Sequence, residues 1–245
     1  MSTAPLLEVQ GVTKRFGGLL ANDGISFTVN SGEIVGIIGP NGSGKSTLFS
    51  CITGFYRPEA GRVVYQGKDI TGRSADKICK EGIARTFQIV QVISDMTALE
   101  NVMTGAFLRS AKKATARAKA EEVLAFTGLW EKRDMGATSL TIPDKKRLEV
   151  AMALATQPKL LMLDEAMAGL TPVELRQMLA LVRKVRENGV TLVIVEHVME
   201  AVMELSDRVI GINSGRKIVE DVPQKVVVNP EVIRAYLGER YHARA

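Results

Sequence analysis

Cysteine and histidine are rare in this chain. Cys51 and Cys79 are the only cysteines, and the two histidines are His197 and His242. The cysteine spacing fits neither a disulfide framework nor a zinc site, so we expect reduced thiols, as in a cytosolic protein, and no metal ligation by this pair. Aromatic residues make up only 5% of the chain. They are not interleaved with basic residues, so the pattern of a base-stacking nucleic-acid binder is missing.

Long hydrophobic runs are also missing. No stretch approaches the roughly 20 apolar residues that span a bilayer. Residues 1–7 have neither the basic start nor the long apolar core of a secretory signal, so we expect none. The 245 residues are 46% hydrophobic and 24% charged, which is ordinary for a soluble globular protein of one or two domains. The net charge of +5 suits an acidic ligand or a membrane surface, and we expect no nucleic-acid partner.

The most informative stretch is residues 34–55. Residues 34–38 (IVGII) predict a buried strand, residues 39–44 (GPNGSG) a loop, and residues 45–53 a helix that stops near Gly54. A strand, a glycine loop and a Lys-Ser pair at a helix start are typical of a phosphate-binding loop, and a simple glycine turn would not explain that pair. Glycine lets backbone N–H groups approach phosphate oxygens, and the helix N-terminus attracts the anion. We expect Lys45 to contact the outer phosphates and the Ser46 hydroxyl to ligate Mg²⁺.

Strand and helix patterns alternate along most of the rest of the chain. Such alternation favours an α/β fold with a mainly parallel sheet covered on both faces. Helices are predicted at residues 98–107, 111–126, 144–155, 172–187 and 198–205, and turns at 17–18 and 22–24. Strands are predicted at residues 7–12, 25–29, 62–65, 160–163 and 190–195, with a hairpin formed by 208–213 and 217–221.

Two acidic residues, Asp164 and Glu165, directly follow the predicted strand at 160–163. A carboxylate at the end of a buried strand is costly without a partner, and Mg²⁺ on a bound nucleotide would supply one. Asp164 is therefore a candidate metal residue, and Glu165 a candidate base that orients an attacking water. The alternative is that the two acids only mark the exit of the strand into solvent. The phosphate-binding loop upstream favours the functional interpretation.

His197 and Gln88 are further polar candidates. His197 follows the predicted strand at 190–195 and Glu196. A histidine there could simply cap the strand, but beside a γ-phosphate a neutral imidazole could accept from water and donate to an oxyanion. Gln88 follows residues 84–87 (ARTF), and its amide could reach metal and water. The residue type alone is weak support, because glutamine is common on surfaces.

These motifs, in this order and spacing, resemble the ATPase subunits of ABC transporters. Residues 14–19 (KRFGGL), 83–88 (IARTFQ) and 168–172 (AGLTP) are similar to the subunits of branched-chain (hydrophobic) amino-acid importers. The resemblance runs from about residue 6 to about residue 238. It implies one ABC ATPase domain over residues 1–245, with a P-loop NTPase core, an N-terminal antiparallel β subdomain and a helical subdomain. The RecA-like core with the β subdomain would take residues 6–87 and 145–238, and the helical subdomain residues 88–144.

The resemblance also implies roles for single residues. Phe16 would stack on adenine, although a core aromatic is the alternative. Gln88 would link the nucleotide to the membrane subunit, Glu165 would be the catalytic carboxylate, and His197 the switch histidine. Residues 168–171 would touch the opposing subunit. The implied magnesium residues are Ser46, Gln88 and Asp164, and the implied ATP-binding residues are Phe16, Gly39, Asn41, Gly42, Ser43, Gly44, Lys45, Ser46 and Thr47.

The signature segment departs from the family pattern. Where the family usually has LSGGQ, residues 140–144 are LTIPD, so Leu140, Thr141 and Asp144 would face the partner's ATP. The Thr141 hydroxyl could bind γ-phosphate, but Pro143 lacks an N–H donor. Asp144 brings a negative charge, or it caps a helix that begins at Lys145. If the partner is a different subunit, the two sites of the dimer could turn over unequally.

The partners that the resemblance implies are a second ATPase subunit, identical or different, two membrane permeases and, indirectly, a periplasmic solute-binding protein. ATP and Mg²⁺ would be the cofactors, and the chain would sit peripherally on the cytoplasmic face of the inner membrane. The alternatives are a soluble non-transport ABC ATPase and a P-loop small-molecule kinase. One ATPase unit with a short helical insert favours transport, and a kinase would need neither Glu165 nor His197. Amino acids are the leading solutes, while urea, amides and aromatic acids stay open.

Overall fold

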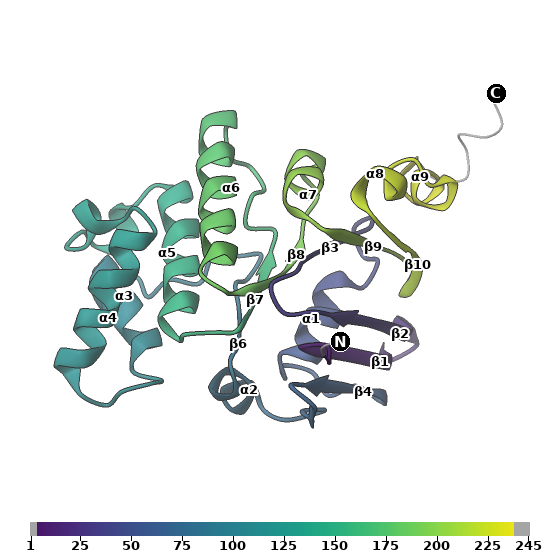
Figure 1. The fold of residues 1–245 in the computed structure, drawn as a ribbon, viewed down its shortest axis with the longest axis horizontal. Helices are drawn as coiled ribbons and strands as arrows, with labels where there is room; N and C mark the ends of the chain where they lie inside the picture. Colours follow the sequence, from purple (N-terminus) through teal and green to yellow (C-terminus); the bar gives the residue numbers. More distant parts are fainter. Residues whose placement is uncertain (1–3, 238–245) are drawn as a thin grey trace.

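The computed structural model describes residues 4–237 (Figure 1). Its N-terminal part forms an antiparallel sheet of four strands in the order β2-β1-β4-β5. These strands are β1 (Leu7–Phe16), β2 (Leu19–Val29), β4 (Ala60–Tyr65) and β5 (Lys68–Asp69). The turn predicted at residues 22–24 is wrong, because these residues lie within β2. The register with β1 shifts there and Gly24 has a φ of +63°, as in a bulge.

A second sheet of six strands has the order β10-β9-β3-β8-β7-β6. Its strands are β3 (Ile34–Ile38), β6 (Ile83–Arg85), β7 (Leu160–Asp164), β8 (Thr191–Val195), β9 (Arg208–Asn213) and β10 (Arg216–Asp221). All neighbours are parallel except β9 and β10, which form the predicted hairpin. Every residue of β3, β7 and β8 is buried, which explains their continuous apolar sequences. The α/β fold with a mainly parallel sheet is thus confirmed.

Helices cover both faces of the parallel sheet. Helix α1 (Lys45–Ile52) shares one core with both sheets. On the other face, α5 (Ile142–Ala155) and α6 (Pro172–Glu187) pack on β7 and β8, and α3 (Ala98–Ala106) and α4 (Lys113–Phe126) pack outside α5 (Figure 1). Within residues 4–237, no helix is both long and apolar enough to cross a bilayer. The remaining helices are α2 (Ala75–Glu81), α7 (Met199–Leu205), α8 (Pro223–Val226) and α9 (Pro230–Leu237), with 3₁₀ turns at Trp130–Lys132 and Ala137–Ser139.

The start of α5 differs from the prediction. The helix begins at Ile142 rather than Asp144, and Thr141 is the N-cap, because its hydroxyl accepts the N–H of Asp144. Asp144 is therefore not the cap, and Pro143 fits the first turn, where a missing N–H costs nothing. By contrast, α6 has the predicted bounds, and Thr171 with Glu174 forms a capping box at its start. Helices α2, α8 and α9 were not predicted.

Helix α9 reaches back to the loop that follows β3. The hydroxyl of Tyr236 accepts the backbone N–H of Gly39 at 2.8 Å, and Gly39 itself is buried. Helix α9, the last described element, thus holds the first residue of the glycine loop. His242 and the end of the resemblance near residue 238 lie outside the described residues.

Replacing Tyr236 with Phe removes the acceptor for this N–H and leaves the ring in place. A buried donor without a partner costs about 1–3 kcal/mol. We expect Tyr236→Phe to lower the free energy of unfolding by about 1 kcal/mol, measured by urea denaturation. Tyr56→Phe is the matched control, since Tyr56 is similarly exposed and no hydrogen bond of its hydroxyl is described in residues 4–237. Equal stability of the two variants would contradict the prediction.

Candidate functional site

The glycine loop runs from the end of β3 to the start of α1. Gly44 precedes α1 with a φ of +102°, and a Cβ there would lie 2.1 Å from the carbonyl oxygen of Ala21. The Asn22 side chain donates from Nδ2 to the carbonyl oxygen of Gly44 at 3.0 Å. The irregular part of β2 therefore supports the loop from behind, and it admits only glycine at this position.

Lys45 is the first residue of α1 and is buried. Its Nζ donates to the carbonyl oxygens of Gly39 at 2.8 Å and Pro40 at 2.9 Å. Burial lowers the pKa of Lys45, while the charges of Glu165 and Asp164 oppose the shift. The ammonium group thus lies within the loop and is attracted by Asp164, the last residue of β7, and by Glu165 after it.

A cavity of about 520 Å³ opens beside the loop, a size suited to a nucleotide. Phe16, at the end of β1, is 42% exposed and packs edge-to-face on Tyr56 with ring centroids 5.2 Å apart. It is therefore not a core aromatic. Gly39, the buried first residue of the loop, is not among the described residues that line the cavity. The lining includes Phe16, Asn41, Gly42, Ser43, Gly44, Lys45, Ser46, Thr47, Gln88 and Glu165.

Three candidate catalytic residues meet at one carboxylate. Gln88 Nε2 donates to Oε2 of Glu165 at 2.9 Å, and His197 Nε2 lies 2.9 Å from Oε1. Their convergence follows from the parallel strands, because β6, β7 and β8 all end at the same edge of the sheet. Glu165 has a φ of +52°, a left-handed conformation that is strained for a residue with a side chain. The chain therefore holds this carboxylate in place against a local preference.

Asp164 has a partner that the sequence did not reveal. Arg85, the last residue of β6, donates from Nη2 to Oδ2 of Asp164 at 3.0 Å, and Asp164 is only 1% exposed. Burial raises the pKa of Asp164, and the charge of Arg85 opposes the shift. Arg85 also donates to the hydroxyl of Ser50 on α1 at 3.1 Å. No local pattern in the sequence pairs Arg85 with Asp164, which lies 79 positions further along the chain.

The donor set of the site fits a magnesium ion shared with phosphates. Among the described residues, the buried Oδ1 of Asp164 has no hydrogen-bond partner, so it is free to accept a ligand. Ser46 and Gln88 present a hydroxyl and an amide to the adjoining cavity. No group of three or more His, Cys, Asp or Glu side chains within residues 4–237 could hold a metal by itself. A metal here would need oxygens from a bound nucleotide.

Two buried charged residues fix the segment after Glu165. Lys146 of α5 donates from Nζ to the carbonyl oxygens of Glu165 at 3.1 Å and Ala168 at 2.7 Å. Glu196, after β8, accepts the N–H of Met167 at 2.9 Å, and burial raises the pKa of Glu196 to about 7. Sequence reasoning assigned neither residue a role, because both make their contacts with distant backbone.

The signature segment is built as a helix start. Thr141 is exposed, and its hydroxyl donates to Oδ2 of Asp144 at 2.8 Å. Asp144 is 2% exposed and pairs with Lys132 and with Arg147, the latter at 2.7 Å. Lys132 and Arg147 compensate the negative charge of Asp144, which points into the protein. Leu140 is also buried. Of the three predicted signature residues, only Thr141 presents a side chain at the surface.

Comparisons with known proteins agree with this geometry. A family model described as ABC transporter matches residues 22–168, and one described as branched-chain amino acid ATP-binding cassette transporter matches residues 216–242. The chain is 40% identical to the high-affinity branched-chain amino acid transport ATP-binding protein BraF of Pseudomonas aeruginosa, over 96% of this chain and 98% of BraF. It is 38% identical to the corresponding protein LivG of Escherichia coli, with the same coverage.

Solved structures show the same likeness. A crystal structure of an ABC transporter ATP-binding cassette in its ADP conformation has a TM-score of 0.88 and 33% identity, over 97% of this chain and 100% of that one. A dimeric cassette in a post-hydrolysis state, bound to ADP and Pi, has a TM-score of 0.80 and 27% identity, over 89% and 98% of the chains.

Two glycines of the loop provide a matched test of its packing. Both have positive φ, but a Cβ on Gly44 meets the backbone of Ala21, whereas nothing lies within 4 Å of a Cβ on Gly42. We expect Gly44→Ala to destabilise the protein by about 3 kcal/mol or more, and Gly42→Ala by only about 1 kcal/mol. Urea denaturation without nucleotide measures both. Equal losses would show that backbone strain, and not the contact with β2, selects glycine at Gly44.

Proposed function

The chain belongs to the ABC transporter family of ATP-hydrolysing subunits, and we propose that the transporter it powers imports branched-chain or other hydrophobic amino acids. The observation that carries the site assignment is the carboxylate of Glu165, which contacts both Gln88 and His197 beside the glycine loop. The relatives BraF and LivG, which match almost end to end, support the solute class. Neither a kinase nor a non-transport ABC ATPase has comparable support.

ATP is the nucleotide that fills the cavity in this proposal. Phe16 stacks on the adenine, and the N–H groups of the loop and the N-terminus of α1 hold the phosphates. Lys45 Nζ exchanges the carbonyl oxygens of Gly39 and Pro40 for the outer phosphates. Because these carbonyl oxygens already hold the ammonium group inside the loop, the Lys45 side chain needs to move little to reach the phosphates.

Glu165 orients the attacking water in the hydrolytic step. Gln88 and His197 each contact one of its two oxygens, so these contacts keep the carboxylate oriented toward the glycine loop that would bind the phosphates. Lys45 Nζ stabilises the charge that develops on the transferred phosphoryl group, while Nε2 of His197 stays on Glu165. Ser46, Asp164 and Gln88 would hold Mg²⁺, which would supply neutralising charge at the phosphate oxygens. No covalent enzyme intermediate is needed.

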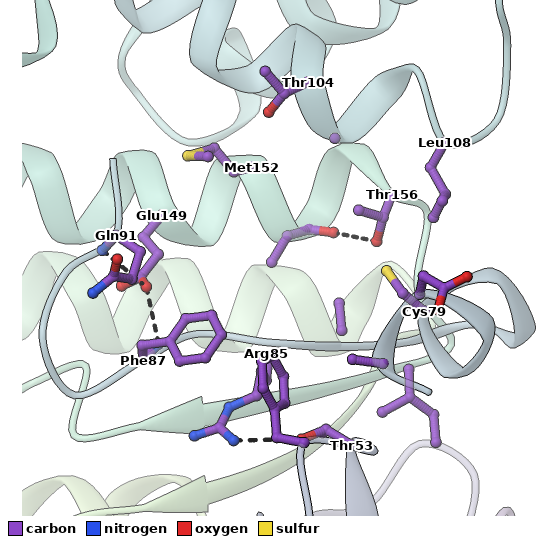
Figure 2. Close-up of a pocket in the computed structure, with 17 residues that line it drawn as sticks. Thr53, Cys79, Arg85, Phe87, Gln91, Thr104, Leu108, Glu149, Met152 and Thr156 are labelled. Carbon is purple, nitrogen blue, oxygen red and sulfur yellow. Dashed lines mark hydrogen bonds between the residues drawn. The ribbon is translucent and has the colours of Figure 1, made fainter. Parts of the chain in front are cut away.

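A groove next to Gln88 is the proposed contact with a permease. It has a volume of about 410 Å³ and lies between α5, α2 and the segment after β6, with Phe87, Gln91 and Met152 in its lining (Figure 2). Ile89 is 76% exposed and Ile93 41% exposed in the same segment, so this segment also offers apolar side chains to a partner. Docking there would bring a membrane subunit to the residues that flank Gln88. The chain would then sit peripherally on the cytoplasmic face of the membrane, with a solute-binding protein on the other side.

A second ATPase subunit completes each ATP site in this proposal. The dimeric structure of a related cassette supports such an assembly. The Thr141 end of α5 would face the partner's ATP, and the N–H donors of a glycine-rich signature are reduced there by Pro143. In a heterodimer, the ATP site of the partner, which this chain completes, would therefore be weaker than the ATP site of this chain, which the partner completes.

Glu165→Gln and Lys45→Ala should separate hydrolysis from binding. We expect Glu165→Gln to lower the rate of phosphate release by at least about 100-fold while ATP binding is retained, because only the water-orienting carboxylate is lost. Lys45→Ala should instead weaken the binding of a fluorescent ATP analogue. Near wild-type hydrolysis by Glu165→Gln would rule out the assigned role.

Unequal sites can be tested in a heterodimer. We expect Glu165→Gln in this chain and the equivalent change in the partner subunit to reduce total ATPase activity by different amounts. The larger loss should follow Glu165→Gln, since the site of this chain is closed by the partner's signature. Equal losses would count against asymmetry.

A further inference from the structure

Glu149 is a buried carboxylate that the hydrolytic mechanism does not use. It lies on α5, is 7% exposed, and lines the groove of Figure 2. Its Oε1 accepts the backbone N–H of Phe87 at 2.9 Å and that of Gln91 at 3.4 Å. These two residues flank Gln88, and Figure 2 shows Glu149 reaching from its helix toward both.

The segment that contains Gln88 depends on few other contacts. Between β6 and α3 the backbone forms neither helix nor strand. Thr86 donates its N–H to the carbonyl oxygen of Met162, and Ile93 donates to the Asn101 side chain. Apart from a local bond from the Gln91 side chain to the carbonyl oxygen of Ile89, the described bonds to the backbone between these two anchors are those of Glu149. A carboxylate is a strong acceptor for paired N–H groups, so Glu149 fixes the curve of the loop from which the Gln88 side chain projects.

The charge of Glu149 has compensation nearby. Burial raises the pKa of Glu149 to about 7, while the two N–H groups that it binds and the charges of Lys146 and Arg85 favour its ionised form. Lys146, one turn earlier on α5, contacts the carbonyl oxygens of Glu165 and Ala168. One helix therefore holds the backbone on both sides of the Gln88–Glu165 hydrogen bond.

We propose that Glu149 is a positioning residue for hydrolysis, which binds the N–H groups of Phe87 and Gln91 and thereby holds the Gln88 amide against Glu165. The proposal rests on the proposed function, since it assigns Gln88 a part in hydrolysis. Glu149 does not touch the nucleotide, so its loss should affect turnover and leave the binding of ATP unchanged.

An isosteric pair of variants separates positioning from packing. Glu149→Met fills the same space without an acceptor, whereas Glu149→Gln keeps an oxygen for the two N–H groups. With the purified full-length chain and saturating MgATP, we expect Glu149→Met to lower kcat about tenfold and Glu149→Gln by no more than about threefold, with KM for ATP within about twofold of wild type in both. Equal effects of the two variants would overturn the proposal. Glu100→Met, which removes a bond of the same kind to Thr97 at 2.9 Å, should leave kcat unchanged.

A double-variant cycle tests whether Glu149 acts through Gln88. Adding Glu149→Met to Gln88→Ala should lower kcat by no more than about a further twofold, because the residue being positioned is already gone. A further loss close to tenfold would overturn the proposal. If Glu149→Met does not fold, Glu149→Asp replaces it, since the shorter side chain cannot keep both bonds and should give the same pattern.

Amide hydrogen exchange provides a readout that needs no activity. In Glu149→Met without nucleotide, a peptide covering residues 87–91 should exchange about tenfold faster, while peptides from β3 and β8 remain protected. Unchanged exchange in residues 87–91 would overturn the proposal even if activity falls. A wild-type chain that does not hydrolyse ATP would refute the proposed function, and the exchange result would still decide whether Glu149 holds the loop.

Discussion

The common parallel direction of β3, β6, β7 and β8 is the constraint on which the site depends. Parallel neighbours end at the same edge of a sheet, so the glycine loop, Gln88, Glu165 and His197 meet there although they are far apart in the chain. Burial on both faces makes β3, β7 and β8 apolar except at Thr191, where β8 begins, and Asp164, where β7 ends. Polar side chains therefore lie at or beyond the ends of these strands, which is where the proposed hydrolysis takes place.

Charged side chains near this edge of the sheet hold the candidate site residues and their backbone in place. Arg85 pairs with Asp164, Lys146 binds the backbone after Glu165, and Glu196 binds the N–H of Met167. Arg85 and Asp164 form a buried ion pair, so removing one would leave the charge of the other unpaired. Lys146 and Glu196 instead satisfy backbone carbonyl and N–H groups. The carboxylate of Glu165, proposed to be catalytic, is thus supported by charged side chains from β6, α5 and the segment after β8.

The apolar strands, α6 and the order of the polar residues after each strand could be predicted, because short-range patterns determine them. The partners of buried charges could not. Asp164 and Arg85 are separated by 79 positions in the chain, and no local pattern shows that their strands are neighbours. Short elements such as α2 and β6 depend on tertiary contacts more than on propensity. Residues 22–24 resemble a turn in sequence because a bulge uses the same residue types. Thr141, and not Asp144, caps α5 because its hydroxyl accepts the N–H three residues further on.

At Glu165, the left-handed backbone and the proposed chemistry favour different residue types. Glycine or asparagine would adopt a φ of +52° with less strain, so the fold by itself favours a residue without a carboxylate there. Only a carboxylate can serve the chemistry proposed for this position. A search for more stable variants of this protein would therefore be drawn toward inactive ones at this residue, and stability gained there would come at the expense of turnover.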